Sequence, residues 1–314
     1  MKLLITRPLP DPVMQAARAR FDVTARASTL PLNHAELRQA LSDFDVVLPT
    51  LGDLFKAEVF ADVPQPRAKL LANFGVGYNH IDTAAAKALG IAVTNTPGAV
   101  TDATADVVLT LMLMTARRAG EGERMLRAGA WQGWHPVQML GAPVSGKTVG
   151  IIGMGRIGRA IAQRCHFGFG MQVIYHNRST VDAGVPARQV PMAEVLQADF
   201  VVIAVPGGPA TRHLINAAAL AQMSRHAIMI NIARGDVVDE AALVAALQTG
   251  QIAGAGLDVY EHEPVVSPAL IGMENVTLLP HLGTAVLETR TAMGMMAVAN
   301  LIAFQDGQPL PNPV

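Results

Sequence analysis

The sequence predicts an α/β protein built around two parallel sheets, one in each of two domains. Short apolar runs alternate with longer amphipathic stretches almost throughout, which is typical of strands joined by helical crossovers. This alternation stops once, at a long helical stretch (101–118) and an irregular segment containing Trp131, Trp134, Pro136 and Pro143, and it restarts at Lys147. With 314 residues, 51% of them hydrophobic, the chain is long enough for two cores.

The elements before the interruption follow from local signals. Gly90 ends one predicted helix, as glycine commonly does just past a helix terminus. Asp102 is placed to cap the helix 101–118, and Arg117 and Arg118 suit its C-terminal end. We expect strands at 3–5, 46–48, 69–74 and 91–93, and helices at 12–20, 34–42 and 83–89.

The second half continues the same alternation. Apolar runs predict strands at 147–152, 172–175, 200–205, 227–232, 254–259 and 275–279, with helices at 159–165 and about 288–304. The first region is too short for a complete large sheet, so we expect it to recruit the last helix. The predicted domains are therefore 1–98 together with 285–314, and 99–284.

Composition and charge exclude several classes of protein. Lys and Arg number 24 against 25 Asp and Glu, so no strong field attracts nucleic acid or a membrane surface. The single cysteine, Cys165, forbids an internal disulfide and suits a reducing compartment. The apolar run 107–116 is too short to span a bilayer, and Arg7 and Pro8 interrupt the N-terminus before a signal-length stretch. We expect a cytoplasmic protein.

A glycine motif follows the strand 149–152. Gly153, Gly155 and Gly158 fit G-x-G-x-x-G, which serves a tight turn, close approach of a pyrophosphate and close helix–strand packing. The free N–H groups at the start of the next helix favour an anion. The alternative is a tight turn without a ligand, but the strand-turn-helix context favours a Rossmann-type dinucleotide site.

The next strand carries no acidic residue where an NAD site usually has one. It is followed by His176, Asn177, Arg178 and Ser179, and Arg178 lies 20 residues after Gly158 (178 − 158). Arg binds a phosphate with its guanidinium fork, and the neighbouring side chains can add hydrogen bonds. The sequence therefore favours NADP(H). If Arg178 stacks on the adenine instead, NAD(H) remains possible.

Three polar side chains follow three successive predicted strands. Arg234, Glu263 and His281 would meet at the carboxyl edge of a parallel sheet, where ligands bind. Each alone has an ordinary structural interpretation. Together they supply a cation for an anionic substrate, a proton donor for a carbonyl and a carboxylate that favours the donor's imidazolium form, as hydride transfer requires. No metal-ligand spacing is present, and no metal is expected.

The chain resembles the D-isomer-specific 2-hydroxyacid dehydrogenases over nearly its whole length, and most closely their NADPH-dependent glyoxylate/hydroxypyruvate reductase branch. The resemblance implies a smaller flavodoxin-like substrate domain and an active site in the cleft between the domains. It is carried by the glycine turn, the segment 175–178 and the segments 73–82, 95–98, 101–106, 230–236, 257–264 and 278–284.

The resemblance also implies roles for particular residues. Arg234 would bind the substrate carboxylate and 2-oxo group, His281 would be the general acid/base, and Glu263 would hydrogen-bond it. Backbone N–H groups of Val76 and Gly77 would hold the carboxylate. Further cofactor contacts would come from Thr104, Arg156, Ile157, Pro206, Thr211, Ile232 and Asp258. Homodimers would form through the cofactor domain, with the segment 131–143 reaching across.

Several alternatives stay open. Leu51 and Gly52 lie where a substrate loop could form, or in an ordinary strand-to-helix turn. The expected reaction is reduction of glyoxylate or hydroxypyruvate to a D-2-hydroxy acid, but a phosphite or phosphoglycerate dehydrogenase shares the same motifs. A nucleotide-sensing scaffold like the family's transcriptional corepressors would retain them as well.

Overall fold

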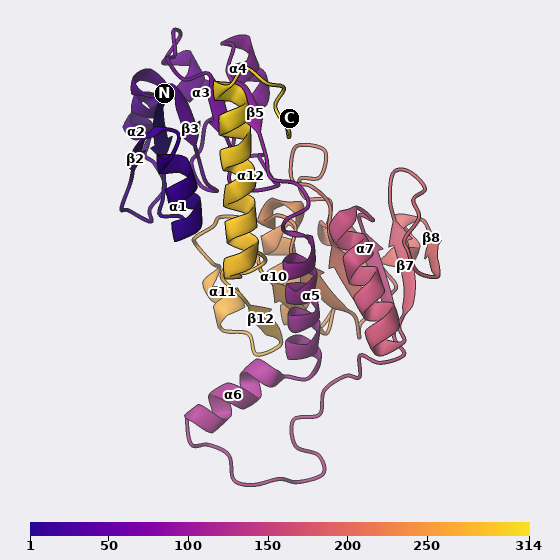
Figure 1. Ribbon diagram of the computed structural model, residues 1–314. Helices are drawn as coiled ribbons and strands as arrows, with labels where there is room; N and C mark the ends of the chain where they lie inside the picture. The colour runs from indigo at the N-terminus through magenta and orange to yellow at the C-terminus, as the bar shows by residue number, and fades with distance from the viewer. The chain divides into compact units, whose positions relative to one another are not determined.

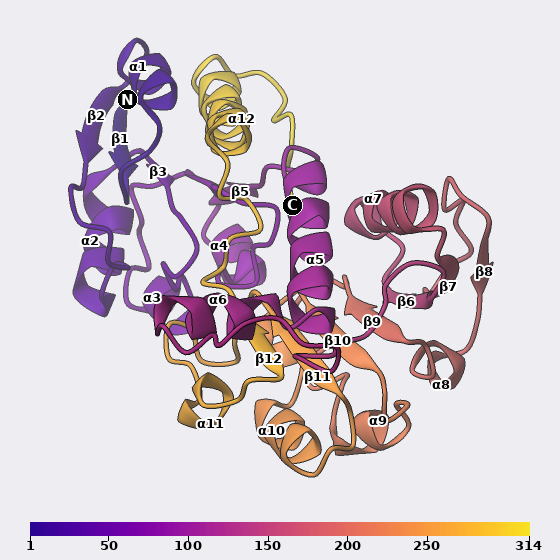
Figure 2. The same ribbon diagram turned by 90° about the horizontal axis from the view of Figure 1, so that it is seen from below.

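A computed structural model describes residues 1–314, which form two compact units (Figures 1 and 2). Unit 1 comprises Met1–Val100 and Ala285–Val314, and unit 2 comprises Thr101–Thr284. The chain thus leaves unit 1, builds the whole of unit 2, and returns to complete unit 1 with its last helix.

Unit 1 contains a parallel five-stranded sheet of order β2-β1-β3-β4-β5, the flavodoxin-like order. Local capping starts its helices: Asn33 and Glu36 form a capping box on α2, and the Asp82 carboxylate accepts from the N–H of Ala85 at the start of α4. The strands are β1 (Lys2–Ile5), β2 (Asp22–Ala25), β3 (Val46–Leu48), β4 (Leu70–Ala72) and β5 (Ala92–Thr94). The helices are α1 (Asp11–Arg18), α2 (His34–Asp43), α3 (Ala57–Ala61), α4 (Thr83–Ala88) and α12 (Leu287–Gln305).

Helix α12 is an integral part of the unit 1 core. Its residues Val298 and Leu301 are buried in the same cluster as Leu3 of β1 and Val13 of α1. At Gly294 the two helices touch so closely that an added Cβ would lie 2.5 Å from a methyl carbon of Val13. The sheet of unit 1 therefore depends on a helix that lies far away in the sequence.

Unit 2 contains a parallel seven-stranded sheet of order β12-β11-β10-β9-β6-β7-β8, a Rossmann-like arrangement whose strand order reverses between β6 and β9. The strands are β6 (Thr148–Ile152), β7 (Gln172–His176), β8 (Ala187–Gln189), β9 (Phe200–Ile203), β10 (Ile228–Asn231), β11 (Gly254–Leu257) and β12 (Val276–Leu278). The helices are α5 (Thr101–Ala116), α6 (Ala119–Arg127), α7 (Arg156–Gln163), α8 (Met192–Val195), α9 (Ala217–Ala221), α10 (Glu240–Gln248) and α11 (Pro268–Ile271). The expected α/β class with two parallel sheets is confirmed.

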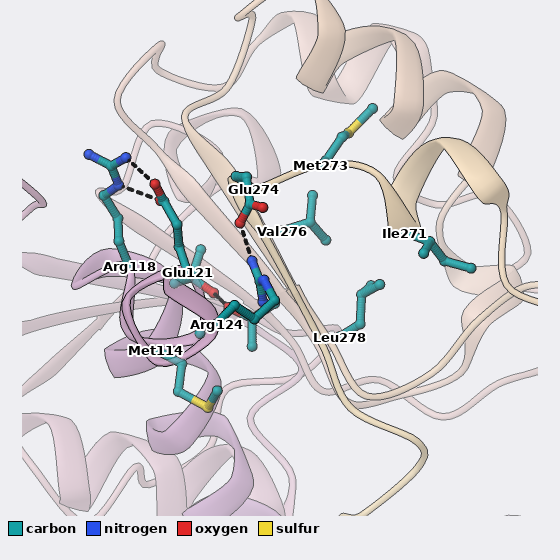
Figure 3. Close-up of a pocket in the computed structure, with 12 residues that line it drawn as sticks. Met114, Arg118, Glu121, Arg124, Ile271, Met273, Glu274, Val276 and Leu278 are labelled. Carbon is teal, nitrogen blue, oxygen red and sulfur yellow. Dashed lines mark hydrogen bonds and ion pairs between the residues drawn. The ribbon is translucent and has the colours of Figure 1, made fainter. Parts of the chain in front are cut away.

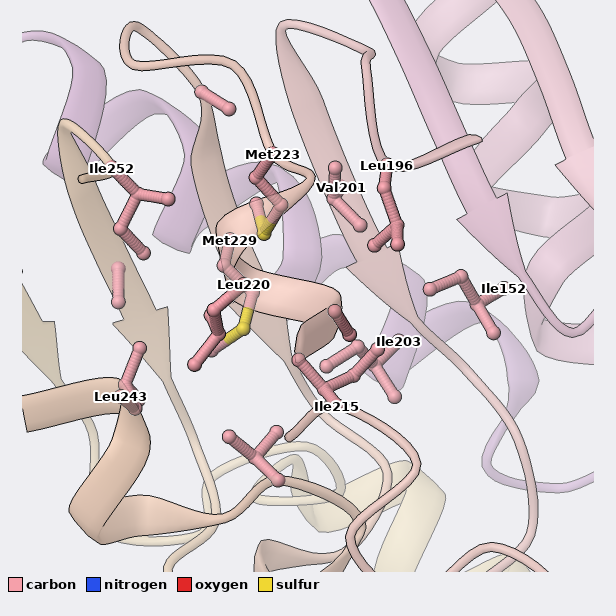
Figure 4. Packing of buried hydrophobic residues seen from close by; sticks show 14 of the residues in the cluster. Ile152, Leu196, Val201, Ile203, Ile215, Leu220, Met223, Met229, Leu243 and Ile252 are labelled. Carbon is pink, nitrogen blue, oxygen red and sulfur yellow. The ribbon is translucent and has the colours of Figure 1, made fainter. Parts of the chain in front are cut away.

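Both faces of the unit 2 sheet are buried. Because side chains alternate along a strand, Met229 of β10 points into one core while Ile228 and Ile230 point into the other. Figure 4 shows the core that contains Met229. Leu220 of α9 and Leu243 of α10 are buried in the same cluster and cover this face of the sheet. This double packing holds the strand ends rigidly, and the site is built on those ends.

Some local predictions were wrong. Helix α7 begins at Arg156 rather than 159 and continues into a π-turn, Arg164–Gly168. Asp102 does not cap α5, which begins at Thr101; it lies in the first turn and forms an ion pair with Arg164 at 3.0 Å. The sequence analysis missed strands β2 and β8 and helices α3, α6, α8, α9, α10 and α11. The two edge strands bury no residue fully, so neither carries a strong apolar pattern.

Helix α6 and the loop after it project from the end of α5 in Figure 1. No residue of α6 is buried, and large apolar side chains are exposed along the helix and the loop: Leu126, Trp131, Trp134, Val137 and Leu140. None of the helices of the chain is both long enough and apolar enough to cross a lipid bilayer.

Candidate active site

The three predicted catalytic side chains follow three neighbouring strands of unit 2. Arg234 comes three residues after β10, Glu263 lies in the loop after β11, and His281 comes three residues after β12. The strands are adjacent and parallel, so their loops emerge at the same edge of the sheet. The parallel pairing of these strands thus brings the three loops to one edge of the sheet.

His281 and Glu263 form a direct ion pair. The Nδ1 atom of His281 lies 2.9 Å from Oε2 of Glu263, and each side chain is 31% exposed. Burial raises the pKa of the Glu263 carboxyl, but the hydrogen bond and charge of His281, the N–H of Tyr260 and the charge of Arg234 together hold that pKa below its ordinary value. An ionised carboxylate only accepts, so Nδ1 carries a proton and Nε2 is left for other chemistry.

The turn that carries His281 is held by the buried Asp258. Its backbone oxygen accepts from His281 N at 3.0 Å, and its two carboxylate oxygens accept from the N–H groups of Leu282 (2.6 Å) and Gly283 (2.8 Å). His281 has a φ of 55°, which non-glycine residues rarely adopt. Burial raises the pKa of Asp258, while these two hydrogen bonds favour its charged form. Asp258 thus fixes a strained backbone, as functional sites often require.

Arg234 is positioned by the residue that ends β10. Asn231 is 1% exposed, its amide nitrogen donates to Arg234 O at 3.1 Å, and its amide oxygen accepts from Ala233 N at 3.0 Å. Burial lowers the pKa of the Arg234 guanidinium, whereas the carboxylates of Glu263 and Asp236 raise it. The guanidinium stays cationic at neutral pH. Asn231 was not predicted as a functional residue, although a polar side chain at the end of an apolar strand is a usable signal.

Gly235 makes the closest contact between the two loops that carry Arg234 and Glu263. A Cβ placed on Gly235 would lie 1.8 Å from the carbonyl carbon of Tyr260 and 2.4 Å from the N of Glu261. Only glycine permits this approach, so the two loops are locked together by backbone contact. Nothing in the local sequence pattern distinguishes this glycine from an ordinary turn residue.

The glycine motif has the geometry of a dinucleotide turn. Gly153 has a φ of 99°, and a Cβ on Gly158 would lie 2.2 Å from the Gly153 oxygen, so both positions require glycine. A Cβ on Gly155 would meet no atom within 4 Å, which leaves open space beside the start of α7. The N–H groups of Arg156 and Ile157 begin this helix without helical partners. These residues fit a pyrophosphate.

The segment after β7 forms a turn held by hydrogen bonds of Asn177 and carries the exposed side chain of Arg178. Asn177 donates its amide hydrogens to Ser179 O at 2.8 Å and to Ser179 Oγ at 3.4 Å, and it accepts from the N–H of Met154 at 3.2 Å. His176 lies at the end of β7, with Nδ1 3.2 Å from Val190 O. Arg178 is exposed and forms no ion pair with an acid of the chain. The asparagine is therefore already used within the protein, while the arginine is available.

The other predicted cofactor contacts also lie near the carboxyl ends of the unit 2 strands. Thr211 Oγ1 donates to Pro206 O at 2.7 Å in the loop after β9, and Ile232 directly follows β10. Thr104 of α5 donates to Gly283 O at 3.2 Å, which joins α5 to the His281 turn. The structure thus gathers these positions around the same sheet edge.

Within unit 1, Leu51 and Gly52 form the turn after β3. Asp53, fully buried, accepts from the hydroxyl of Thr6 at 2.6 Å and from the N–H of Thr50 at 2.9 Å, and Arg7 donates to Leu51 O. This turn is therefore tightly braced. Val76 and Gly77 lie in the half-buried loop after β4. The bracing residue Asp53 was not predicted.

Unit 2 also holds a separate cavity of about 190 Å³, lined by residues of α5, α6, α11 and β12 (Figure 3). Its charged residues are paired internally: Arg118 with Glu121 at 2.6 Å, and Arg124 with Glu274. It shares no residue with the Arg234, Glu263 and His281 group or with the glycine turn. Its lining holds no histidine or cysteine, and it lies apart from the glycine turn, so we assign the chemistry to the strand-end site.

Comparison with known proteins agrees with this geometry. Residues 109–283 match the family "D-isomer specific 2-hydroxyacid dehydrogenase, NAD binding domain". A glyoxylate reductase of Thermococcus onnurineus is 42% identical over 318 residues, covering 99% of this chain and 94% of that protein, and a glyoxylate/hydroxypyruvate reductase B of Serratia proteamaculans is 40% identical, covering 97% and 94%. The crystal structure of an NADPH-dependent glyoxylate/hydroxypyruvate reductase from Sinorhizobium meliloti, in complex with NADP and malonate, has a TM-score of 0.88 at 35% identity and covers 100% of this chain and 96% of that one. The chain therefore belongs to the D-isomer specific 2-hydroxyacid dehydrogenase family.

Proposed function

We propose that this protein reduces small 2-oxo acids, glyoxylate and hydroxypyruvate, to the corresponding 2-hydroxy acids with NADPH. The observation that carries the proposal is the His281–Glu263 ion pair beside Arg234, at the edge of the sheet that also bears the dinucleotide turn. Relatives at 40–42% identity named glyoxylate reductase and glyoxylate/hydroxypyruvate reductase support the choice of substrate.

The chain's own residues divide the work. Arg234 binds the substrate carboxylate and polarises the 2-oxo group, because a guanidinium fork matches a carboxylate and stabilises charge that develops on the oxygen. His281 gives the proton at Nε2 to that oxygen, while Glu263 holds Nδ1 and stabilises the imidazolium. Val76 and Gly77 bind the carboxylate through their N–H groups, and Leu51 and Gly52 border the substrate. The bound nicotinamide supplies the hydride.

NADPH is the preferred cofactor in this proposal. Gly153, Gly155 and Gly158 hold the pyrophosphate, and Arg178 binds the 2′-phosphate, with Ser179 and His176 beside it. The test compares kcat/KM for NADPH and NADH in the wild type and in Arg178→Ala. We expect the wild type to prefer NADPH and the variant to lose most of that preference. A wild type that prefers NADH would refute this assignment.

The decisive experiment follows oxidation of NADPH with glyoxylate and hydroxypyruvate, with phosphite and 3-phosphoglycerate as competing substrates assayed with the oxidised cofactor. His281→Ala should lower kcat by roughly 10²–10⁴-fold and leave NADPH affinity unchanged. His226→Ala, at the opposite end of β10, is the matched control and should keep full activity. Turnover of phosphite alone, or no turnover of any of these substrates, would overturn the proposed reaction.

We also propose that the protein is a homodimer formed through unit 2. Trp131 is 50% and Trp134 is 78% exposed in the projecting segment 131–143, and such aromatic side chains are typical of a covered interface. Light scattering after size exclusion should give twice the mass of one chain. Replacing Trp134 by Ser should weaken the association, whereas a monomeric wild type at micromolar concentration would contradict it.

A further inference from the structure

The loop 75–77, proposed to bind the substrate carboxylate through its N–H groups, is held by hydrogen bonds to its carbonyl oxygens. Three successive carbonyl oxygens, those of Gly75, Val76 and Gly77, all accept from side-chain amides. Asn73 Nδ2 donates to Gly75 O at 3.0 Å and to Gly77 O at 3.1 Å. Asn95 Nδ2 donates to Val76 O at 2.8 Å. Two asparagines, one after β4 and one after β5, thus donate to all three carbonyl oxygens of the loop.

These bonds determine where the N–H groups point. A peptide unit is planar, and its C=O and N–H are directed oppositely, so fixing one fixes the other. Asn73 holds the oxygen of Gly75 and thereby aims the N–H of Val76, while Asn95 holds the oxygen of Val76 and thereby aims the N–H of Gly77. Neither N–H donates to another group of the protein, and both residues are half-buried. Adjacent backbone donors of this kind suit an anion.

A histidine fixes the orientation of the Asn73 amide. His80 Nε2 lies 3.0 Å from Asn73 Oδ1, Asn73 is fully buried and His80 is 4% exposed. The amide nitrogen of Asn73 already uses its hydrogens on two carbonyls, so Oδ1 must accept and Nε2 of His80 must donate. A rotated amide would turn its oxygen toward two carbonyl oxygens, and His80 opposes that rotation.

We propose that Asn73 and Asn95, with His80 setting the amide of Asn73, are positioning residues that aim the N–H groups of Val76 and Gly77 at the substrate carboxylate. They act on substrate affinity and on the choice of carboxylate-bearing substrates, not on the hydride or proton step. The inference rests on the proposed function for the identity of the substrate. The donor geometry itself is independent of that function.

The test separates aiming from simple stabilisation of the loop. Asn73→Asp keeps the size of the side chain and the acceptor for His80 but removes both donors, and Asn95→Asp removes one. Asn33→Asp is the matched control, because Asn33 caps α2 at the surface of the same unit and an aspartate can also cap. For each variant, KM for glyoxylate, kcat, NADPH affinity and thermal stability are measured. Binding of oxamate, a non-reducible analogue, to the NADPH-loaded protein is measured by calorimetry.

We expect Asn73→Asp to raise KM and the oxamate Kd by roughly 10- to 100-fold, and Asn95→Asp by roughly 3- to 10-fold, as the loss of two and of one hydrogen bond predicts. kcat and NADPH affinity should change by less than about threefold at these sites because they reflect other interactions. His80→Ala should raise KM, and His80→Gln, which retains a donor, should restore much of the wild-type value.

Two results would overturn the inference: KM and oxamate Kd within twofold of wild type in both aspartate variants, or equal losses in oxamate and NADPH affinity. Failure of the proposed function looks different. If the wild type reduces no 2-oxo acid yet binds oxamate, and Asn73→Asp loses that binding, the inference holds and the function fails. If the wild type binds no oxamate, the inference fails.

Discussion

Replacing Gly235 by Ala should damage activity more than stability. The new Cβ would lie 1.8 Å from the Tyr260 carbonyl carbon, so the two loops must separate by about 1.2 Å to reach even a 3.0 Å contact. Overpacking of this kind costs about 1–3 kcal/mol. The same movement separates Arg234 from Glu263, and a misplacement of about 1 Å in an active site can cost about 10²-fold in rate.

The assay compares kcat/KM for glyoxylate with the melting temperature. We expect kcat/KM to fall about 100-fold, and Tm to fall by about 2–4 °C for each kcal/mol in a unit of this size. Gly168→Ala is the matched control, because a Cβ there meets no atom within 4 Å and Gly168 lies at the end of the π-turn, outside the site. Activity of Gly235→Ala within twofold of wild type would refute the claim that this contact fixes the two loops.

Three further outcomes follow from the charges and burial in unit 2. The pKa of Glu263 lies below its ordinary value, so its charged form stabilises the fold above the unfolded-state pKa, and that contribution is lost as pH falls through the folded value. The difference in unfolding free energy between wild type and Glu263→Gln should therefore shrink below about pH 4.5, and a difference that grows in acid would contradict this. In Asp258→Asn the side chain has only one oxygen to accept the N–H groups of Leu282 and Gly283. We therefore expect kcat to fall by about tenfold, with little change in the circular dichroism spectrum. An unchanged kcat would show that the His281 turn does not need both acceptors. Burial raises the pKa of Cys165 to about 12, so iodoacetamide at pH 8 should label the unfolded protein and leave the native one unlabelled; rapid native labelling would show that the site opens.

Much of the fold could be predicted because its signals are local. Buried parallel strands read as short apolar runs, and the glycine turn marks the start of the second sheet. Parallel order then places Arg234, Glu263 and His281 at one edge without further information. Their catalytic roles stay predictions, because a shared edge shows proximity and not chemistry.

The features that could not be predicted depend on partners distant in the sequence. Gly235 matters because of the Tyr260 loop, which only the folded chain brings into contact with it. Asn73 and Asn95 lie in segments that resemble the family, but Asn95 reaches the Val76 oxygen only when β4 and β5 pair, and only then do both side chains hold the same loop. The φ of His281 likewise has no sequence signal, since Asp258 imposes it.

The discontinuity of unit 1 has a consequence for biosynthesis. Residues 101–284 must be translated before α12 can leave the ribosome, a delay of roughly 10–40 s at about 5–20 residues per second. Until then the nascent chain exposes the apolar surface formed by Leu3, Ile5 and Val13, which α12 later covers. Unit 2 is one continuous segment of the chain, so its folding does not depend on a later part of the sequence. Chaperone dependence during synthesis should therefore concentrate on the first hundred residues, and a ribosome stalled before α12 should display them as a protease-sensitive segment.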